Sequence, residues 1–183
     1  MTEVLAIFVR YGFRKTSMDD VARAIGISRQ ALYKRYESKE ALFRLVVSRV
    51  IESSLSGAMD ALDNDTVSLS GRLLNAFDSW AGQHVDVLRS SPHSLEVIEM
   101  AKAQAGETSK RAEGKIAKRV AELLCETGSP AARAAAADAA FALACASKGL
   151  LHTAENRSDY KNGMKRVISG FLVSSDHPAK TKK

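Results

Sequence analysis

The sequence predicts an all-α protein. Along almost the whole chain, apolar residues recur every three or four positions, the spacing that places them on one face of a helix. The composition points the same way, because Ala is abundant while the 183 residues include only three Pro and 6% aromatic residues. No segment shows the alternation of apolar and polar residues that is typical of a strand. With 45% hydrophobic residues, the chain has enough apolar material for a packed core.

Short local signals delimit the first two helices. The apolar stripe of the first helix consists of Val4, Leu5, Phe8 and Val9. Gly12 is expected to end that helix, because glycine accepts the left-handed backbone conformation that often follows a helix. Thr16 is predicted to cap the second helix, with Asp19 three residues later completing a capping box. Gly26 then interrupts the helical pattern.

The third and fourth helices also begin at serine caps. Ser28 is a favourable cap for a short third helix, in which Leu32 and Tyr36 are expected to face inward. Ser38 caps a fourth helix, whose apolar stripe continues toward Leu55. These short elements place three helices and two tight turns in the first quarter of the chain.

The rest of the chain predicts further helices that are separated by recognisable breaks. Such breaks are predicted at residues 63–65, 90–92, 105–106 and 128–129. Ser129 is expected to cap the helix after the last break, with Pro130 in its first turn, where the missing N–H group costs nothing. Asp159 opens a final helix. We therefore expect about nine or ten helices in all.

The charge of the chain is concentrated near its N-terminus. The net charge is +6. Residues 1–45 hold nine basic and five acidic residues, a net charge of +4, whereas residues 46–183 have a net charge of +2. A basic N-terminal quarter is compatible with a polyanionic partner such as nucleic acid.

The same quarter has the pattern of a helix-turn-helix. Gly26 lies in the turn at residues 24–27, where a left-handed conformation lets two helices cross steeply, and the later helix of such a pair enters the major groove of DNA. Arg29 and Gln30 fall in the first turn of that helix, and their side chains suit guanine and adenine respectively. Side chains that suit phosphate groups surround them, namely Thr16, Ser17, Tyr33, Lys34, Tyr36 and Lys39, and the cap residue Ser28 is also a candidate DNA-binding residue.

Each of these residues also has a simpler interpretation. Taken alone, Arg29 and Gln30 are ordinary solvated residues. Thr16 and Ser28 cap helices whether or not DNA is present. Tyr36 is open to two interpretations, core packing and phosphate contact. Only the joint spacing of the residues favours a DNA-binding role.

That spacing resembles the N-terminal domain of the TetR family of transcriptional regulators. The pattern, within about residues 5–45, reads Phe8-x-x-x-Gly12-Phe13-x-x-Thr16-Ser17-Met18-x-x-Val21-Ala22-x-x-x-Gly26-Ile27-Ser28-x-x-x-Leu32-Tyr33-x-x-Tyr36-x-Ser38-Lys39-Glu40-x-Leu42. The resemblance implies phosphate contacts from Thr16, Ser17, Tyr33, Tyr36 and Lys39. It implies base contacts from Arg29 and Gln30, with Ala31 or Lys34 as a third. Ala31 replaces a frequent Thr or Ser of the family, so one polar contact is expected to be missing.

The resemblance also implies a TetR-like domain organisation. Residues 1–45 are expected to form the helix-turn-helix DNA-binding domain, residues 46–175 a helical domain for ligand binding and dimerisation, and residues 176–183 a disordered tail. Family members are usually homodimers on a palindromic site, so two recognition helices must lie about 34–36 Å apart. The last two helices are the expected interface, with candidate residues Phe141, Leu150, Leu151, Ile168 and Phe171. The alternative is that these faces belong to the core of one protomer.

A small-molecule effector is the other partner that the resemblance implies. Candidate ligand-binding residues in the middle helices are Phe77, Trp80, His84, Leu88, Met100 and Leu123. Trp80 and His84 are four residues apart and are expected to face the same way on one helix. The simpler interpretation of each residue is ordinary core packing or, for His84, a surface position. An apolar or aromatic effector suits this set.

The function expected from the sequence is sequence-specific regulation of transcription, by a repressor that an effector releases from its operator. The alternative is a DNA-binding protein that responds to no ligand. An enzyme is not expected, since the chain has no glycine-rich phosphate loop and its four histidines lack ligand spacing. Neither a metal nor another cofactor is expected.

A cytoplasmic location is expected as well. No signal peptide is visible, and no apolar run was found to approach the roughly 18 residues of a membrane span. The two cysteines, Cys125 and Cys145, are expected to be buried reduced thiols.

Overall fold

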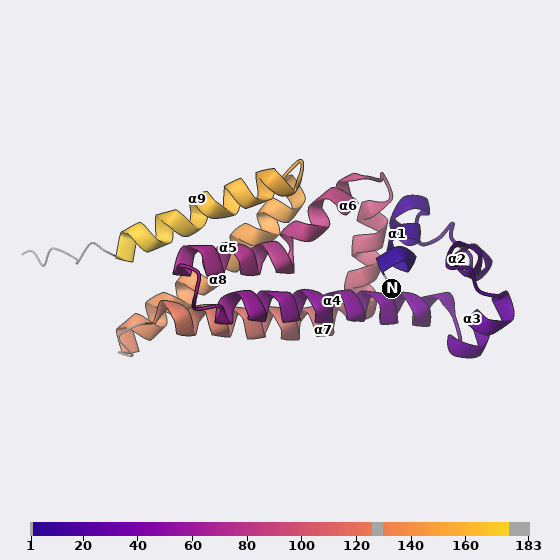
Figure 1. The fold of residues 1–183 in the computed structure, drawn as a ribbon, viewed down its shortest axis with the longest axis horizontal. Helices are drawn as coiled ribbons and strands as arrows, with labels where there is room; N and C mark the ends of the chain where they lie inside the picture. The colour runs from indigo at the N-terminus through magenta and orange to yellow at the C-terminus, as the bar shows by residue number, and fades with distance from the viewer. Residues whose placement is uncertain (1, 126–129, 176–183) are drawn as a thin grey trace, which may run out of the picture. The chain divides into compact units, whose positions relative to one another are not determined.

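The computed structural model describes residues 2–125 and 130–175, which form nine α-helices and one 3-10 helix with no strand among them (Figure 1). The helices are α1 (Thr2–Tyr11), α2 (Met18–Ala24), α3 (Arg29–Arg35), α4 (Lys39–Asp63), α5 (Leu69–Trp80), η1 (Gly82–His84), α6 (Val85–Arg89), α7 (Ser94–Leu124), α8 (Pro130–Thr153) and α9 (Arg157–Ser175). The predicted all-α class is confirmed. The predicted cap at Ser129 and the predicted tail at 176–183 lie outside the described residues.

The chain divides into two compact units, each discontinuous in sequence. The first, which we call the head unit, comprises Met1–Ser54 and Asp86–Ala112, and the second, the bundle unit, comprises Leu55–Val85 and Glu113–Lys183. The domain boundary predicted after residue 45 lies inside α4, and the boundary between the two compact units lies further along the same helix, between Ser54 and Leu55. No linker separates domains there, because α4 is one helix of 25 residues whose Val46 and Val47 are buried in the core of the head unit.

Three phenylalanines form the centre of the head unit. The rings of Phe8, Phe13 and Phe43 lie 4.9–5.5 Å apart between centroids, in tilted and edge-on arrangements that aromatic pairs favour. Val97 and Ala105, both from α7, belong to the same buried cluster. The first half of α7 is therefore part of the core that supports the N-terminal helices.

Two backbone signals in the head unit match the expectation from sequence. Gly12 has φ +85° and ends α1, and a Cβ atom at this position would lie 2.7 Å from Oε2 of Glu96. Glycine is thus required there by both conformation and space. At Ala105, where a break was predicted, φ is −137° and ψ is 18°, so α7 is kinked and not divided.

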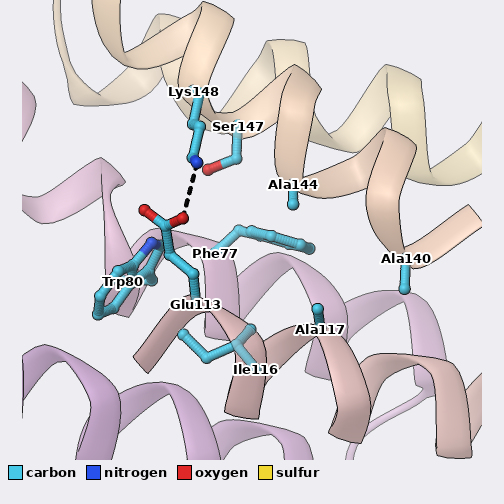
Figure 2. Close-up of a pocket in the computed structure, with 9 residues that line it drawn as sticks. All are labelled: Phe77, Trp80, Glu113, Ile116, Ala117, Ala140, Ala144, Ser147 and Lys148. Carbon is cyan, nitrogen blue, oxygen red and sulfur yellow. Dashed lines mark hydrogen bonds and ion pairs between the residues drawn. The ribbon is translucent and has the colours of Figure 1, made fainter. Parts of the chain in front are cut away.

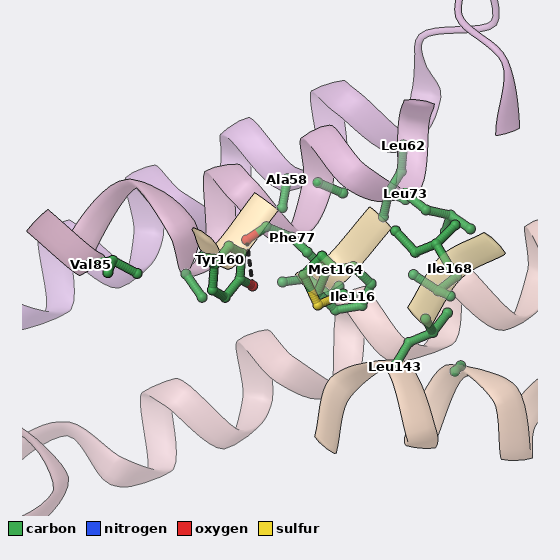
Figure 3. Close-up of a cluster of buried hydrophobic side chains, with 14 of the residues drawn as sticks. Ala58, Leu62, Leu73, Phe77, Val85, Ile116, Leu143, Tyr160, Met164 and Ile168 are labelled. Carbon is green, nitrogen blue, oxygen red and sulfur yellow. Dashed lines mark hydrogen bonds between the residues drawn. The ribbon is translucent and has the colours of Figure 1, made fainter. Parts of the chain in front are cut away.

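The core of the bundle unit gathers apolar side chains from α4, α5, α7, α8 and α9 around Tyr160 (Figure 3). The hydroxyl of Tyr160 donates to the carbonyl of Phe77 at 3.1 Å and lies 2.6 Å from Oγ of Ser147. Burial raises the pKa of this phenol. Because both Tyr160 and Ser147 are buried, the hydrogen bonds satisfy polar groups that water does not reach.

A buried carboxylate fixes the start of α9 to α5. Both oxygens of Asp78 accept hydrogen bonds from Arg157, at 2.9 and 2.8 Å, and Lys161 lies 3.4 Å from the same carboxylate. Burial by itself raises the pKa of Asp78, but the two cations outweigh that effect and hold the pKa below its usual value. A paired, bidentate carboxylate of this kind orients one helix on another.

One part of α8 corrects an expectation from sequence. The segment Arg133–Thr153 has a mean hydropathy of 1.4, and only 22% of the window is buried. By length and composition alone, this segment is long and apolar enough to cross a membrane. The expectation that no apolar run approaches this length is wrong, because many alanines together with a few leucines and Phe141 keep the mean hydropathy of the segment high. Cys145 is exposed on this helix and Cys125 is half-buried, so the expectation of buried thiols is also wrong.

Candidate functional site

Helix α2 begins one residue later than the sequence predicted. Ser17, not Thr16, is the cap of α2: its Oγ accepts from the N–H of Asp20 at 3.2 Å, and Asp20 accepts from the N–H of Ser17 at 2.9 Å. The hydroxyl of Ser17 also donates to the carboxylate of Asp20, and this bond, followed by the one from the backbone N–H of Ser17, lowers the pKa of Asp20. The hydroxyl of Thr16 is buried and donates to the carbonyl of Gly12 at 2.7 Å, at the end of α1. Thr16 therefore has no exposed hydroxyl for a phosphate in this structure.

The turn between α2 and α3 has the geometry expected from sequence. Gly26 has φ +70°, and the N–H of Ile27 donates to the carbonyl of Ala22 at 3.0 Å. Ser28 caps α3 by accepting from the N–H of Ala31 at 3.1 Å, as predicted. Leu32 is completely buried, and this side chain anchors the helix on the head unit.

The outward face of α3 is basic and polar. The helix carries three basic residues and no acidic one. Of the predicted DNA-binding residues, those that lie exposed in or near this helix are Ser17, Ser28, Arg29, Gln30, Tyr33 and Lys34. Tyr36, in contrast, is half-buried and packs against the head core. The first turn of α3 thus offers a guanidinium and an amide to solvent, which are the two groups best suited to base edges.

Arg29 is held on two sides in this structure. Its Nη1 lies 2.9 Å from Oδ2 of Asp19 on α2, and its Cζ lies 5.4 Å from the centre of the Tyr33 ring. The sequence identified Arg29 but assigned Asp19 only to a helix cap. A pairing between α2 and α3 depends on the crossing of the two helices, which spacing alone does not give.

Lys39 has a different place from the one that the sequence suggested. Its ammonium donates to the carbonyls of Phe13 at 2.8 Å, Thr16 at 2.9 Å and Arg14 at 3.4 Å, and it lies 4.5 Å from the centre of the Phe13 ring. An ammonium has three N–H donors. All three have a backbone acceptor here, so Lys39 joins the loop between α1 and α2 to the first turn of α4. Its predicted phosphate contact would compete with these bonds.

Glu96 is a residue of this region that sequence analysis missed. Its Oε1 accepts from the backbone N–H of Arg14 at 2.9 Å, and its side chain lies against Gly12. Glu96 comes from the start of α7, 82 positions further along the chain than Arg14. No local signal in the sequence connects the two. The loop that precedes α2 is therefore fastened both by Lys39 and by α7.

A small cavity lies within the bundle unit (Figure 2). Its walls come from α5, α7 and α8, and it is lined by Phe77, Trp80, Glu113, Ile116, Ala117, Ala140, Ala144, Ser147 and Lys148. At one side, Lys148 donates to Glu113 at 2.7 Å. The volume open to the centre of a water molecule is about 20 Å³, which is room for about one water.

Two of the six predicted ligand-binding residues, Phe77 and Trp80, line this cavity. His84 and Leu123 belong to the bundle unit without lining it, and Leu88 and Met100 belong to the head unit. Trp80 and His84 do not share a helix face, because α5 ends at Trp80 and His84 lies in η1. Burial, and then the charge of Arg157, lowers the pKa of His84.

The predicted interface residues divide into two groups. Phe141 is 70% exposed, while Leu150, Leu151 and Phe171 are half-buried against the bundle core. Ile168 is only 1% exposed, so it is a core residue of the protomer and offers no surface to a partner. The apolar stripe of α9 contains Ile168, and at this residue the stripe faces the core of the bundle unit.

Comparisons with known proteins identify the N-terminal region. Residues 5–46 match the model of the family described as bacterial regulatory proteins, tetR family. The chain is 34% identical over 59 residues to the uncharacterized HTH-type transcriptional regulator YezE of Bacillus subtilis, and 33% identical over 60 residues to the HTH-type transcriptional activator FasR of Mycolicibacterium smegmatis. These matches cover 32% and 33% of this chain, and only 30% and 27% of the two relatives.

Solved structures resemble the chain over nearly its full length. A transcriptional regulator from Rhodococcus sp. Rha1 has a TM-score of 0.71 at 15% identity, with 94% of each chain covered. A TetR-like transcriptional regulator from Rhodococcus sp. RHA1 has a TM-score of 0.65 at 21% identity, with 94% of this chain and 92% of the other covered. At such low identities the likeness establishes the fold alone, and that fold is the TetR-like one expected from sequence.

The position of Lys39 leads to a prediction about stability. Replacing Lys39 with Met keeps the apolar stem but removes the donors to two half-buried carbonyls and one exposed carbonyl, so the free energy of unfolding should fall by about 1–3 kcal/mol. The matched control is Lys34→Met on the exposed face of α3, which should change stability by no more than about 0.5 kcal/mol. Urea unfolding followed by circular dichroism measures both. Equal stabilities for the two variants would show that Lys39 does not hold the loop.

Proposed function

Because residues 5–46 match the model of the tetR family of bacterial regulatory proteins, we propose that this chain is a sequence-specific DNA-binding regulator of transcription. The observation that carries the proposal is the exposed first turn of α3, where Arg29 and Gln30 follow directly on the Ser28 cap. In a helix-turn-helix, this end of the second helix meets the base edges in the major groove. A location in the cytoplasm, with the DNA, follows from this function.

The contacts divide into two classes by chemistry. Arg29 and Gln30 read bases, through bidentate hydrogen bonds to guanine and adenine. Ser17, Tyr33 and Lys34 lie exposed around them and contact phosphates, which fixes the position of the helix but carries no sequence information. Lys39 acts indirectly, by holding the loop before α2 in place.

The two classes of contact predict that replacing Lys34 lowers general DNA affinity, whereas replacing Gln30 lowers discrimination between bases. Lys34→Ala should weaken binding to all sequences and reduce the slope of log affinity against log salt by about 1, because one phosphate contact is lost. Gln30→Ala should keep the slope and lower discrimination at one base position by about 1–3 kcal/mol. Fluorescence anisotropy on duplexes that the wild-type protein selects from random DNA measures both. Wild-type affinity and slope in both variants would contradict the assigned roles.

We further propose a homodimer on a palindromic operator, with the outer face of α8 as its centre. The apolar segment Arg133–Thr153 is mostly unburied within the protomer, and Phe141 stands 70% exposed on it. Exposed apolar surface of this kind is typical of a protein interface. The alanines of α8 permit close approach of a second helix, and Phe141 supplies a large side chain for the contact.

The dimer proposal has a matched pair of variants. Phe141→Glu should shift the protein from dimer to monomer, because the interface would have to bury a carboxylate. Leu95→Glu is the control, since Leu95 is 71% exposed and belongs to the head unit. It should leave the dimer intact. Sedimentation velocity distinguishes the two species, and the same distribution for both variants would refute an interface at Phe141.

The cavity of the bundle unit is the proposed effector site, at which an apolar or aromatic compound binds and releases a repressor from DNA. Its lining is mainly apolar, with the Lys148–Glu113 pair as a polar boundary. Because its volume is only about 20 Å³, side chains must move to admit a ligand. Small lining residues such as Ala117 and Ala144 leave the most room for that movement.

Trp80 supplies a direct readout for this proposal, since it is the single tryptophan of the chain and lines the cavity. A compound that releases the selected duplex should also change the tryptophan emission. Ala144→Leu should abolish both responses by filling the cavity, whereas Ala103→Leu, at an exposed position of α7, should preserve them. DNA release without a change in emission would exclude this cavity. A protein whose DNA binding ignores a broad panel of apolar compounds would be the ligand-independent alternative.

A further inference from the structure

Asp19 and Arg29 form an ion pair that joins α2 to α3. Asp19 lies in the first turn of α2, and its Oδ2 is 2.9 Å from Nη1 of Arg29 in the first turn of α3. The other carboxylate oxygen, Oδ1, is buried and has no hydrogen-bond partner in the described part of the chain. The carboxylate thus faces into the junction of the two helices and meets the guanidinium with one oxygen.

Asp19 is not needed for the cap of its own helix. Ser17 and Asp20 already form the complete capping box of α2. A second acidic residue in a first turn gains a few tenths of a kcal/mol from the helix dipole. The direct partner of Asp19 in the structure is Arg29, so the orientation of that guanidinium is the main effect of the carboxylate.

The guanidinium of Arg29 is fixed by two contacts from different directions. Asp19 contacts Nη1 at 2.9 Å, and Cζ lies over the ring of Tyr33, one turn further along α3, at 5.4 Å from the ring centre. A guanidinium has five N–H donors, and the pair with Asp19 uses one of them. Nε and Nη2 of Arg29 have no partner within the described residues, so this edge of the guanidinium can bind a base. Its two parallel N–H groups match the O6 and N7 acceptors of guanine.

We propose that Asp19 is a positioning residue that presets Arg29 for guanine and thereby sets the base specificity of α3. The inference rests on the proposed DNA-binding function and extends it to a residue that touches no base. A long, solvated arginine loses rotamer freedom when it binds, and a side chain that is already oriented loses less. Asp19 therefore strengthens the correct contact more than contacts to other bases.

Because Asp19 is charged, its removal should have two opposite effects on DNA binding. An acidic residue beside a DNA-facing helix repels phosphates, so its removal should strengthen binding to any sequence. Loss of positioning should instead weaken discrimination at the base that Arg29 reads. The two effects have opposite signs, and a residue that acts by charge alone would show only the first.

The experiment compares Asp19→Ala with Glu37→Ala, which removes an exposed carboxylate from the turn before α4. The wild-type protein first selects a duplex from random DNA, and Arg29→Ala identifies the base position that depends on Arg29. Anisotropy then measures the affinity of each variant for the selected duplex, for the three single-base changes at that position, and for mixed-sequence DNA. Thermal unfolding confirms that the variants are folded.

Asp19→Ala should lower discrimination at the Arg29 position by about tenfold while raising affinity for mixed-sequence DNA. Asp19→Asn, which keeps an acceptor oxygen, should lose less. Glu37→Ala should raise both affinities together and leave discrimination unchanged. In the double variant Asp19→Ala/Arg29→Ala, discrimination should be no lower than in Arg29→Ala alone.

Three results would overturn the inference while the proposed function stands. They are a selected duplex with no guanine at the Arg29 position, unchanged discrimination in Asp19→Ala, and a loss in Asp19→Ala that persists when Arg29 is absent. Failure of the wild-type protein to select any sequence would instead overturn the proposed function, and this inference with it.

Discussion

The arrangement of the head unit depends on the ammonium of Lys39. A cation in the first turn of a helix is unfavourable unless acceptors offset the helix dipole, and the carbonyls of Phe13, Arg14 and Thr16 provide them. These carbonyls belong to the loop that ends α1 and leads to α2. One side chain thereby ties the loop before α2 to the first turn of α4, whereas the crossing of α2 and α3 depends on the turn at Gly26.

The sequence predicted the features that are local and missed those that depend on long-range contacts. Gly12, Gly26 and Ser28 act through their own backbone and immediate neighbours, so their roles could be predicted. The cap of α2 was misplaced by one residue because Thr16 and Ser17 are both followed, three positions later, by an aspartate. Only the bond from Thr16 to the carbonyl of Gly12 separates the two registers. The contact between Glu96 and Arg14 crosses 82 positions and leaves no local pattern.

In the bundle unit as well, the helices could be predicted from local patterns, whereas their packing depends on long-range contacts. Periodicity placed α5, α7, α8 and α9 near their observed ranges, but it does not say which helix covers which. The packing of α9 on α5 is set by two contacts, Arg157 with Asp78 and Tyr160 with the carbonyl of Phe77. The partners in each contact are about 80 positions apart in sequence. Because α9 is held against α5, Ile168 is buried, and the outer face of α8 is an apolar surface that stays uncovered in the described part of the protomer. The cavity depends on side-chain packing between three helices, so only two of its nine lining residues were anticipated.

The sharing of α7 between the two units bears on how a protein of this fold can be divided into fragments. Val97 and Ala105 complete the core around the phenylalanine cluster, although they lie some fifty residues beyond the segment that matches the family. A fragment cut after the helix-turn-helix would expose part of its own interior. Under the proposed function, DNA specificity is therefore easier to exchange by replacing a few side chains on α2 and α3 than by transplanting the whole N-terminal segment.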